Sequence, residues 1–171
     1  MRFNPLFALV ILVAFGAYWL TSDAGGDPTI EYARTDMSMN DAQAEAQRHI
    51  DDFLNFALDN QGIAGEGMLV KVAFPTSIPE KTEVIWVGPF GRTSDGRFEG
   101  ILANAPVDIP SAGTSGNVTF DKAMIRDWMF TGRDGKLYGS YTTRAMLPDM
   151  SPDMARQLTA AFSENPLPRR W

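Results

Sequence analysis

The chain has 171 residues, enough for one targeting segment and one domain with a hydrophobic core. It is 44% hydrophobic and 21% charged, as globular proteins are, and its net charge of −6 argues against binding to the phosphate backbone of a nucleic acid. Because the sequence has no cysteine and one histidine, it excludes disulfides, thiolate metal sites, cysteine nucleophiles and any site that needs two imidazoles from one chain.

Residues 1–24 have the pattern of a membrane-targeting segment. Arg2 precedes an uninterrupted apolar run over residues 6–20, and acidic residues follow the run. This charge order favours an N-terminus inside and a C-terminus outside the membrane. The run has about the length of a signal-peptide core, but the aromatic pair at its outer end suits an interfacial anchor. Both a retained signal-anchor and a signal peptide cleaved after Ala24 remain open, and in either case the rest of the chain lies outside the cytoplasm.

A polar tether and an amphipathic helix are expected next. Residues 25–37 contain glycine and proline among polar residues, which is typical of a tether. Ser38 suits a helix N-cap, and apolar residues recur at helical spacing over residues 39–59. This helix should bury one stripe. We interpret His49 as a half-exposed surface residue at the edge of the stripe, and the acidic residues of the helix as a solvated face (Asp41, Glu45, Asp51 and Asp52).

From residue 68 onward the pattern changes from helical to alternating, which predicts strands. The strand over residues 84–90 is apolar on both faces, so we expect it to be central in the sheet. A turn at residues 91–96 makes it a hairpin with the following strand. The predicted strands in this part of the chain are residues 68–74, 84–90, 97–104 and 117–120.

A second hairpin is expected around Asp134-Gly135, which is a strong signal for a two-residue type I′ turn. Pairing outward from such a turn places Trp128 opposite Tyr141, and Asp127 opposite Thr142. A slipped register or a helical turn in this region would undo the pairing.

The chain is expected to end in a short helix and a tail, residues 148–171. Pro148 closes the sheet, and Ser151-Pro152-Asp153 opens the helix. The segment over residues 166–171 is interpreted as an extended, loosely held end, although Trp171 and the two arginines before it could dock on a partner or on lipid headgroups.

These elements predict an α+β fold. An N-terminal helix packs on a twisted, mainly antiparallel sheet of about five strands, and a short C-terminal helix covers one edge. The membrane or signal segment precedes this domain, which we place at residues 38–147.

No motif for a phosphate-binding loop, a nucleophile elbow or a zinc protease is present in the sequence, so we expect no catalytic residue, no metal, no cofactor and no enzyme. The candidate binding residues are instead polar or aromatic side chains inside apolar strands. Burying a charge is costly unless it is paired. One interpretation is structural: Asp127 pairs with Arg144, and Lys71 with Glu83. The other places them on a concave face of the sheet that binds a ligand or partner. The candidates are Lys71, Glu83, Trp86, Asn104, Asp127, Trp128 and Arg144.

The order of these motifs resembles the YegJ-like family, a bacterial domain of unknown function (2314), over roughly residues 39–147. The resemblance implies a small α+β domain of bacterial origin, and it implies neither an activity nor any catalytic residue. The motifs that carry it are Val70-Lys71-Val72-x-Phe74, Glu83-x-x-Trp86-Val87, Phe98-x-Gly100-x-Leu102-x-Asn104-x-Pro106, Gly116-x-Val118-x-Phe120, Ile125-x-Asp127-Trp128 and Gly139-x-Tyr141-Thr142-x-Arg144.

The leading hypothesis is a non-catalytic binding or accessory protein, tethered to the bacterial inner membrane with its domain in the periplasm. Its partner would be another envelope protein or a membrane complex, because a tether raises the local concentration of a weak binder near membrane partners. One alternative is an immunity or inhibitor protein against an envelope-acting toxin or hydrolase, since an acidic domain suits a basic enzyme. A second alternative is a carboxylate-dependent hydrolase that uses Asp127 or Glu83.

Overall fold

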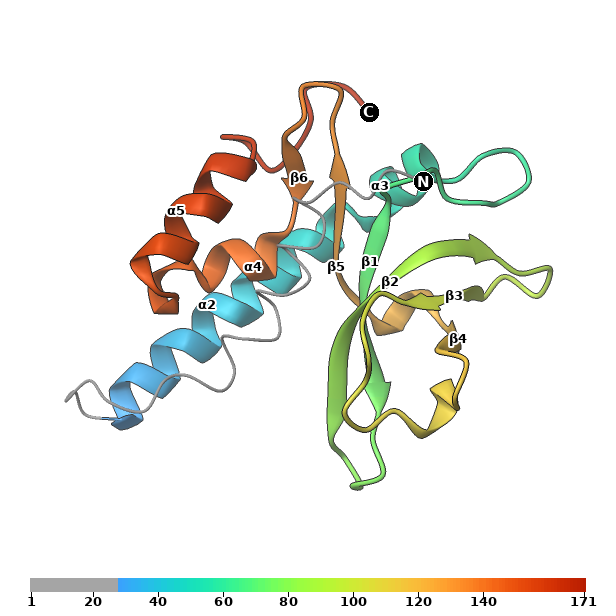
Figure 1. Cartoon of the computed structure of the whole chain (residues 1–171), viewed down its shortest axis with the longest axis horizontal. Coiled ribbons are helices and arrows are strands. Elements are labelled where there is room, and N and C mark those ends of the chain that lie inside the picture. The colour runs from blue at the N-terminus through green and yellow to red at the C-terminus, as the bar shows by residue number, and fades with distance from the viewer. Residues whose placement is uncertain (1–27) are drawn as a thin grey trace.

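The computed structural model describes residues 28–171, with side chains from residue 38 onward (Figure 1). The predicted targeting segment, residues 1–24, lies outside this range. Across the described residues, no helix combines the length and the apolar character that a membrane crossing requires.

The domain is α+β, as predicted, and its antiparallel sheet has six strands in the order β4-β3-β2-β1-β5-β6. The first five predicted strands are found, the last strand lies earlier in the chain than predicted, and the sheet is one strand larger than the expected five or so. The strands are β1 Leu69–Pro75, β2 Thr82–Arg92, β3 Phe98–Leu102, β4 Asn117–Phe120, β5 Ile125–Thr131 and β6 Leu137–Gly139. The helices are α2 Pro28–Arg48, α3 Ile50–Ala57, α4 Tyr141–Ala145 and α5 Pro152–Ala161, with single 3-10 turns at Pro110–Ala112, Lys122–Met124 and Leu147–Asp149.

The predicted helix over residues 39–59 is two helices, α2 and α3, separated at His49. The backbone of His49 has φ −109° and ψ 8°, outside the helical region, and this breaks the run. The helix also begins earlier than expected. Residues 28–37, predicted as part of a tether, belong to α2, and Ser38 lies inside the helix and does not cap it. Pro28 suits the first helical turn because that turn does not need its backbone N–H.

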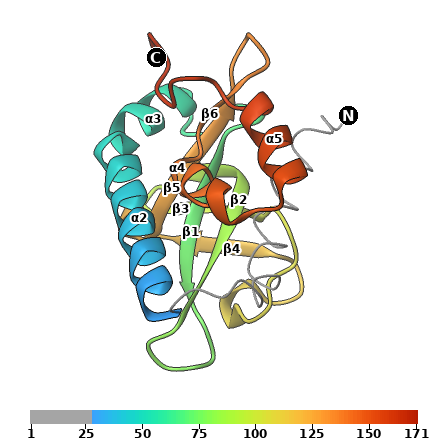
Figure 2. The same ribbon diagram turned by 90° about the vertical axis from the view of Figure 1, so that its left-hand side faces the viewer.

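Two hydrophobic clusters hold helices against opposite faces of the sheet (Figure 2). On one face, α2 and α3 pack on β1 and β5, where the Phe53 ring stacks on Trp128 at 5.0 Å between centroids. On the other face, Leu158 of α5 packs with Leu69 and Trp86. Val70, Val72 and Phe74 of β1 belong to the first cluster and Leu69 to the second, and every residue of the strand except Pro75 is buried.

The register of the second hairpin differs by one residue from the prediction. Met129 lies opposite Gly139, and Phe130 lies opposite Tyr138. The loop holds three residues, 133–135, because the Gly132 N–H donates to the Lys136 carbonyl and Gly135 adopts a left-handed conformation, φ +76°.

The second strand of this hairpin is also shorter than expected. It ends at Gly139, where a Cβ would meet the Trp128 carbonyl oxygen at 2.2 Å, and Ser140 at φ 56° turns the chain into α4. Tyr141 and Thr142, predicted as strand, therefore lie in a helix.

The segment after α5 is held against the domain, contrary to the expected loose tail. The Ser163 N–H donates to the Leu137 carbonyl at 3.0 Å, and the Gly139 N–H donates to the Pro166 carbonyl at 2.8 Å. At its end, the ring of Trp171 lies 5.3 Å from that of Trp128. Backbone hydrogen bonds to β6 and aromatic packing thus hold a segment that was predicted to be loose.

Candidate functional site

Three of the candidate side chains form a row across the sheet. Lys71 of β1 lies directly opposite Trp86 of β2 on one side and Asp127 of β5 on the other. All three are buried, with Lys71 8% exposed and Asp127 0% exposed. The Lys71 ammonium lies 5.6 Å from the centre of the Trp86 ring, within the range of a cation–π contact. We call these residues, together with Thr142 of α4, the buried row.

Hydrogen bonds join the charged members of the row through the Thr142 hydroxyl. That hydroxyl donates to the Asp127 carboxylate at 2.7 Å and accepts from the Lys71 ammonium at 3.0 Å. The carboxylate also accepts the backbone N–H groups of Trp128 at 2.8 Å, Tyr141 at 3.2 Å and Thr142 at 2.8 Å. Asp127 therefore ties the beginning of α4 to β5.

Burial and mutual attraction shift the pKa values of Lys71 and Asp127 in opposite directions. Burial lowers the pKa of Lys71, and the negative charge of Asp127 offsets part of that shift. Burial raises the pKa of Asp127, while the Thr142 hydroxyl and the Lys71 charge oppose the shift. Each ion thus depends on the other for compensation. Asp127 was expected to pair with Arg144 and Lys71 with Glu83; the structure instead connects Asp127 to Lys71 through the Thr142 hydroxyl, with no direct ion pair between the two side chains within residues 38–171.

Arg144 connects β6 to the segment that follows α5. Its guanidinium donates to the backbone carbonyls of Gly139 at 2.8 Å, Ser163 at 2.9 Å and Leu137 at 3.1 Å. It also lies 4.3 Å from the centre of the Phe162 ring. Within residues 38–171, no ion pair joins it to Asp127. Its role is to hold two segments of backbone together.

The remaining candidates lie apart from the row. The Glu83 carboxylate accepts the N–H groups of Val107 at 2.9 Å and Asp108 at 2.7 Å, which fastens the β3–β4 loop to β2. Trp128 is fully buried on the opposite face of β5, and its indole N–H donates to the Ala46 carbonyl at 2.9 Å. Asn104 lies in the β3–β4 loop with a buried side-chain NH₂ that has no partner in the described part of the chain.

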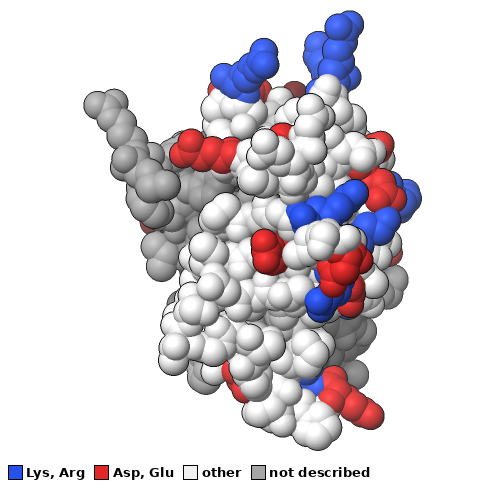
Figure 3. All heavy atoms as spheres, turned by 90° about the vertical axis from the view of Figure 1, so that its right-hand side faces the viewer, with Lys and Arg blue, Asp and Glu red and all other residues white. Residues whose placement is uncertain are grey.

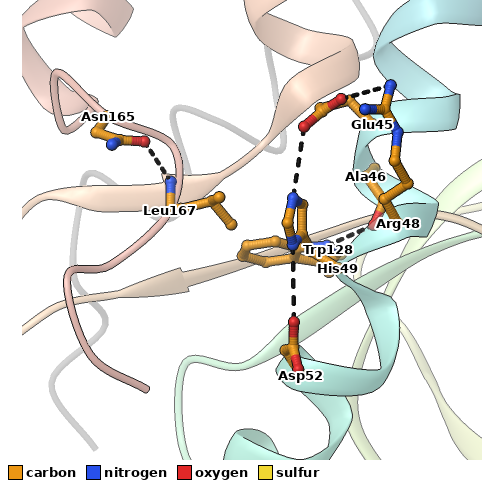
Figure 4. A network of polar contacts seen from close by, with 8 residues as sticks. All are labelled: Glu45, Ala46, Arg48, His49, Asp52, Trp128, Asn165 and Leu167. Atoms are coloured by element: carbon orange, nitrogen blue, oxygen red, sulfur yellow. Dashed lines mark hydrogen bonds and ion pairs between the residues drawn. The ribbon is translucent and has the colours of Figure 1, made fainter.

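His49 lies at the break between α2 and α3 with a carboxylate on each side (Figure 4). Its Nε2 is 3.4 Å from Glu45 and its Nδ1 is 3.7 Å from Asp52, while Arg48 pairs with the same Glu45 at 2.7 Å. The side chain of His49 is 26% exposed, so the expected half-exposed surface position is confirmed. The network braces the two helices across their break.

Two hollows lie beside α3, and together we call them the α3 groove. They have volumes of about 570 and 400 Å³, and Asn55 lines both. The larger hollow is lined by Leu54, Asn55, Leu58, Asp59, Asn60, Gln61, Gly62, Arg92, Thr93 and Ser94. The smaller hollow is lined by Asp52, Asn55, Phe56 and Trp171.

Backbone hydrogen bonds fix the wall of the larger hollow. The Arg92 N–H donates to the Gly62 carbonyl at 2.7 Å, and the Ala64 N–H donates to the Phe90 carbonyl at 2.9 Å. The carboxylate of Asp59 accepts the N–H of Ile63 at 2.9 Å. Gly62 has φ +79°, and a Cβ there would lie 3.3 Å from the Arg92 Cβ, so both the left-handed backbone and the close approach of the two segments favour glycine. The loop after α3 is therefore held against the end of β2.

Aromatic packing positions the smaller hollow. Trp171 packs on Trp128 at 5.3 Å and on Phe56 at 5.8 Å between ring centroids, and Phe56 packs on Phe130 at 4.9 Å. Phe56 and Trp171 remain 39% and 40% exposed. A partly open aromatic surface thus rests on a rigid buried stack.

The polar groups of the groove differ from those of the buried row. The side-chain amides of Asn55, Asn60 and Gln61 have no hydrogen-bond partner within residues 38–171. Of the residues that line the groove, the sequence pattern pointed only to Trp171, as a candidate docking residue, and to Asp52, as part of a solvated helix face. A single sequence carries no signal for the others, because the groove exists only where the loop after α3 pairs with the distant end of β2.

On the face shown in Figure 3, charged side chains gather toward the top and the right of the view, and the area beside them carries few charges. The loop over residues 103–116 contains a single charged residue, Asp108, and its Val107 side chain is 79% exposed.

No group of acidic, histidine or cysteine side chains in the described residues has the arrangement of a metal site.

A family model described as "Uncharacterized protein conserved in bacteria (DUF2314)" matches residues 36–163. No curated protein and no solved structure matches the chain. The matched range runs from α2 to the end of α5, so it includes the C-terminal helix that the resemblance over residues 39–147 left outside. Because this range covers more than half of the 171 residues, the chain belongs to this family of bacterial proteins, DUF2314.

Proposed function

We propose that the protein is a non-catalytic binding or accessory module. It is tethered to the bacterial inner membrane with its domain in the periplasm, and it engages a component of the cell envelope through the α3 groove. The observation that carries this proposal is the contrast between the two polar regions. The charged side chains of the buried row are occupied by groups of the same chain, whereas the groove offers polar and aromatic side chains to solvent.

The geometry of the two acidic candidates also favours binding over carboxylate-dependent hydrolysis. A general acid or base must come within hydrogen-bond reach of its substrate. Asp127 is 0% exposed and accepts hydrogen bonds from α4, and Glu83 accepts two backbone N–H groups of the β3–β4 loop. Both carboxylates hold backbone segments in place.

The membrane part of the proposal rests on the sequence alone. The apolar run over residues 6–20 follows Arg2 and precedes acidic residues, which favours export of the domain. A tether supports a binding role because it confines the domain near the membrane, where a weak interaction can become nearly saturated.

Site-specific photo-crosslinking of the full chain in its native bacterium tests the proposal. A photoreactive amino acid replaces Asn60 in the groove, and the matched control carries it at Gln157 on the exposed side of α5. We expect a discrete adduct with an envelope component from position 60 only, with the protein in the inner-membrane fraction. The same adducts from both positions, or none from position 60, would contradict a role for the groove. Recovery of the protein from the cytoplasm would contradict the tether.

A further inference from the structure

We propose that the α3 groove is a binding site for a neutral saccharide, with a sugar ring stacked on Trp171. This inference rests on the proposed function and names the ligand class for the same site. It draws on the exposed aromatic surface, the free side-chain amides, the distribution of charge and the dimensions of the groove.

The aromatic part of the groove suits the apolar face of a sugar ring. A pyranose presents C–H groups on its faces, and an aromatic ring has a negative face that attracts them while both surfaces leave water. Trp171 offers such a face: it is 40% exposed, and Trp128 and Phe56 support it at 5.3 and 5.8 Å between centroids. Because this support is already in place, little side-chain entropy would be lost when a ring stacks on it.

The polar part of the groove suits hydroxyl groups. A side-chain amide both donates and accepts hydrogen bonds, as a sugar hydroxyl does. Asn55, Asn60 and Gln61 line the groove, and their amides have no partner in the described part of the chain. A ligand can therefore bond to them without displacing an internal hydrogen bond.

The charges that line the groove favour a neutral ligand over a phosphate or another strong anion. Arg92 is the only cation among the lining residues, and its guanidinium lies 5.5 Å from the centre of the Phe98 ring. Asp52 and Asp59 bring negative charge to the same groove. An anion would meet these carboxylates, whereas hydroxyl groups can donate to Asp52.

The dimensions favour an oligosaccharide. The hollows of about 570 and 400 Å³ each fall within the range of small-molecule sites, and they share Asn55, so a chain of sugar rings can pass from Trp171 toward Arg92. A stable protein interface buries roughly 800 Å² on each partner around an apolar centre. Here the strongly exposed aromatic surface is confined to Phe56 and Trp171 at one end.

The test titrates the full chain, in mild detergent, with three neutral tetrasaccharides: chitotetraose, cellotetraose and maltotetraose. Saturation-transfer difference NMR reports contact between sugar protons and the protein, and calorimetry gives the affinity. We expect at least one of the three to bind with a Kd on the order of 10 µM to 1 mM.

Variants locate the binding. Trp171→Ala should weaken it about tenfold or more, while Trp171→Phe, which keeps an aromatic face, should stay within about threefold. Asn55→Ala should weaken it about fivefold, and Asn40→Ala, at an exposed position of α2 outside the groove, should leave it unchanged. Because Asn55 is exposed, its substitution remains informative if Trp171→Ala fails to fold.

The inference is overturned if none of the tetrasaccharides binds at about 10 mM, or if binding persists unchanged in Trp171→Ala and Asn55→Ala. A protein adduct at position 60 without saccharide binding would overturn the saccharide inference alone and leave the proposed function standing. If neither an adduct at position 60 nor saccharide binding is found, the saccharide inference and the proposed role of the groove are both overturned.

Discussion

The buried row and the α3 groove both contain polar side chains but use them in opposite ways. In the buried row, Lys71 and Asp127 are compensated by each other and by Thr142, so their hydrogen bonds end inside the domain. In the groove, Asn55 and Asn60 face solvent on a wall that backbone hydrogen bonds hold in place. The comparison teaches that charged residues embedded in strands here stabilise the fold, while the surface suited to a ligand is built from a loop and a helix.

The largest expected effect is the loss of stability when one charge of the row is removed. Asp127→Ala leaves the Lys71 ammonium buried without compensation and should lower the free energy of unfolding by about 3–5 kcal/mol. Asp41→Ala, at an exposed carboxylate of α2, should change it by less than about 0.5 kcal/mol. Urea unfolding followed by circular dichroism measures both, and equal effects of the two substitutions would contradict a compensated pair.

Replacing both charges sharpens the same comparison. Lys71→Met combined with Asp127→Leu removes both ions, so the double variant should lose less stability than the two single losses together, by at least about 1 kcal/mol. The single variants of this cycle are measured beside it by the same unfolding assay. Additive losses would show that the two side chains act independently.

The next effect concerns the wall of the groove. Gly62→Ala and Gly96→Ala both place a side chain at positive φ and should each cost about 1 kcal/mol. Gly62→Ala should cost more, because its Cβ meets Arg92 at 3.3 Å, whereas Gly96 has no neighbour within 4 Å. Of the two, we expect only Gly62→Ala to reduce crosslinking from position 60. Equal crosslinking in the two variants would contradict a preorganised groove.

A smaller effect should appear at alkaline pH. Burial, with the charges of Glu45 and Asp127, raises the pKa of Tyr141 to about 12. The neutral phenol is therefore favoured in the folded state, and this contribution is fully present below pH 10 and lost as the pH rises through about 12. The free energy of unfolding of the wild type minus that of Tyr141→Phe should fall by roughly 1 kcal/mol across that window, because only the wild type loses this contribution. A constant difference from pH 9 to 12 would contradict the shift.

The sequence predicted the fold class and the first five strands, because alternation, turn residues and an amphipathic stripe are local signals. The prediction was wrong where tertiary contacts determine the length of a loop or the end of a strand. The hairpin loop took three residues instead of two, which shifted the register by one. Tyr141 nevertheless contacts Trp128 edge to face at 5.7 Å, and Thr142 bonds to Asp127, although both come from a helix.

The partners of the charged candidates could not be read from the sequence either. Lys71 and Asp127 are fifty-six positions apart and meet only because β1 lies between β2 and β5. Arg144 could not be assigned to backbone carbonyls, since nothing in the sequence pattern placed residues 163–166 beside β6. The groove could not be predicted for the same reason, because it depends on contacts between segments that are distant in the sequence.

The central claim is that the buried row stabilises the fold and the α3 groove binds the partner. Measuring both stability and crosslinking in one variant of each region tests this claim most directly. Thr142→Val removes the hydroxyl that links Lys71 and Asp127, while Asn55→Ala removes an amide of the groove. We expect Thr142→Val to lower the free energy of unfolding by about 1–3 kcal/mol and to leave crosslinking from position 60 unchanged wherever the protein is folded. Asn55→Ala should keep the stability within about 0.5 kcal/mol and reduce the crosslinked fraction severalfold. The reverse outcome, with binding lost in folded Thr142→Val and retained in Asn55→Ala, would place the function in the buried row and contradict the account.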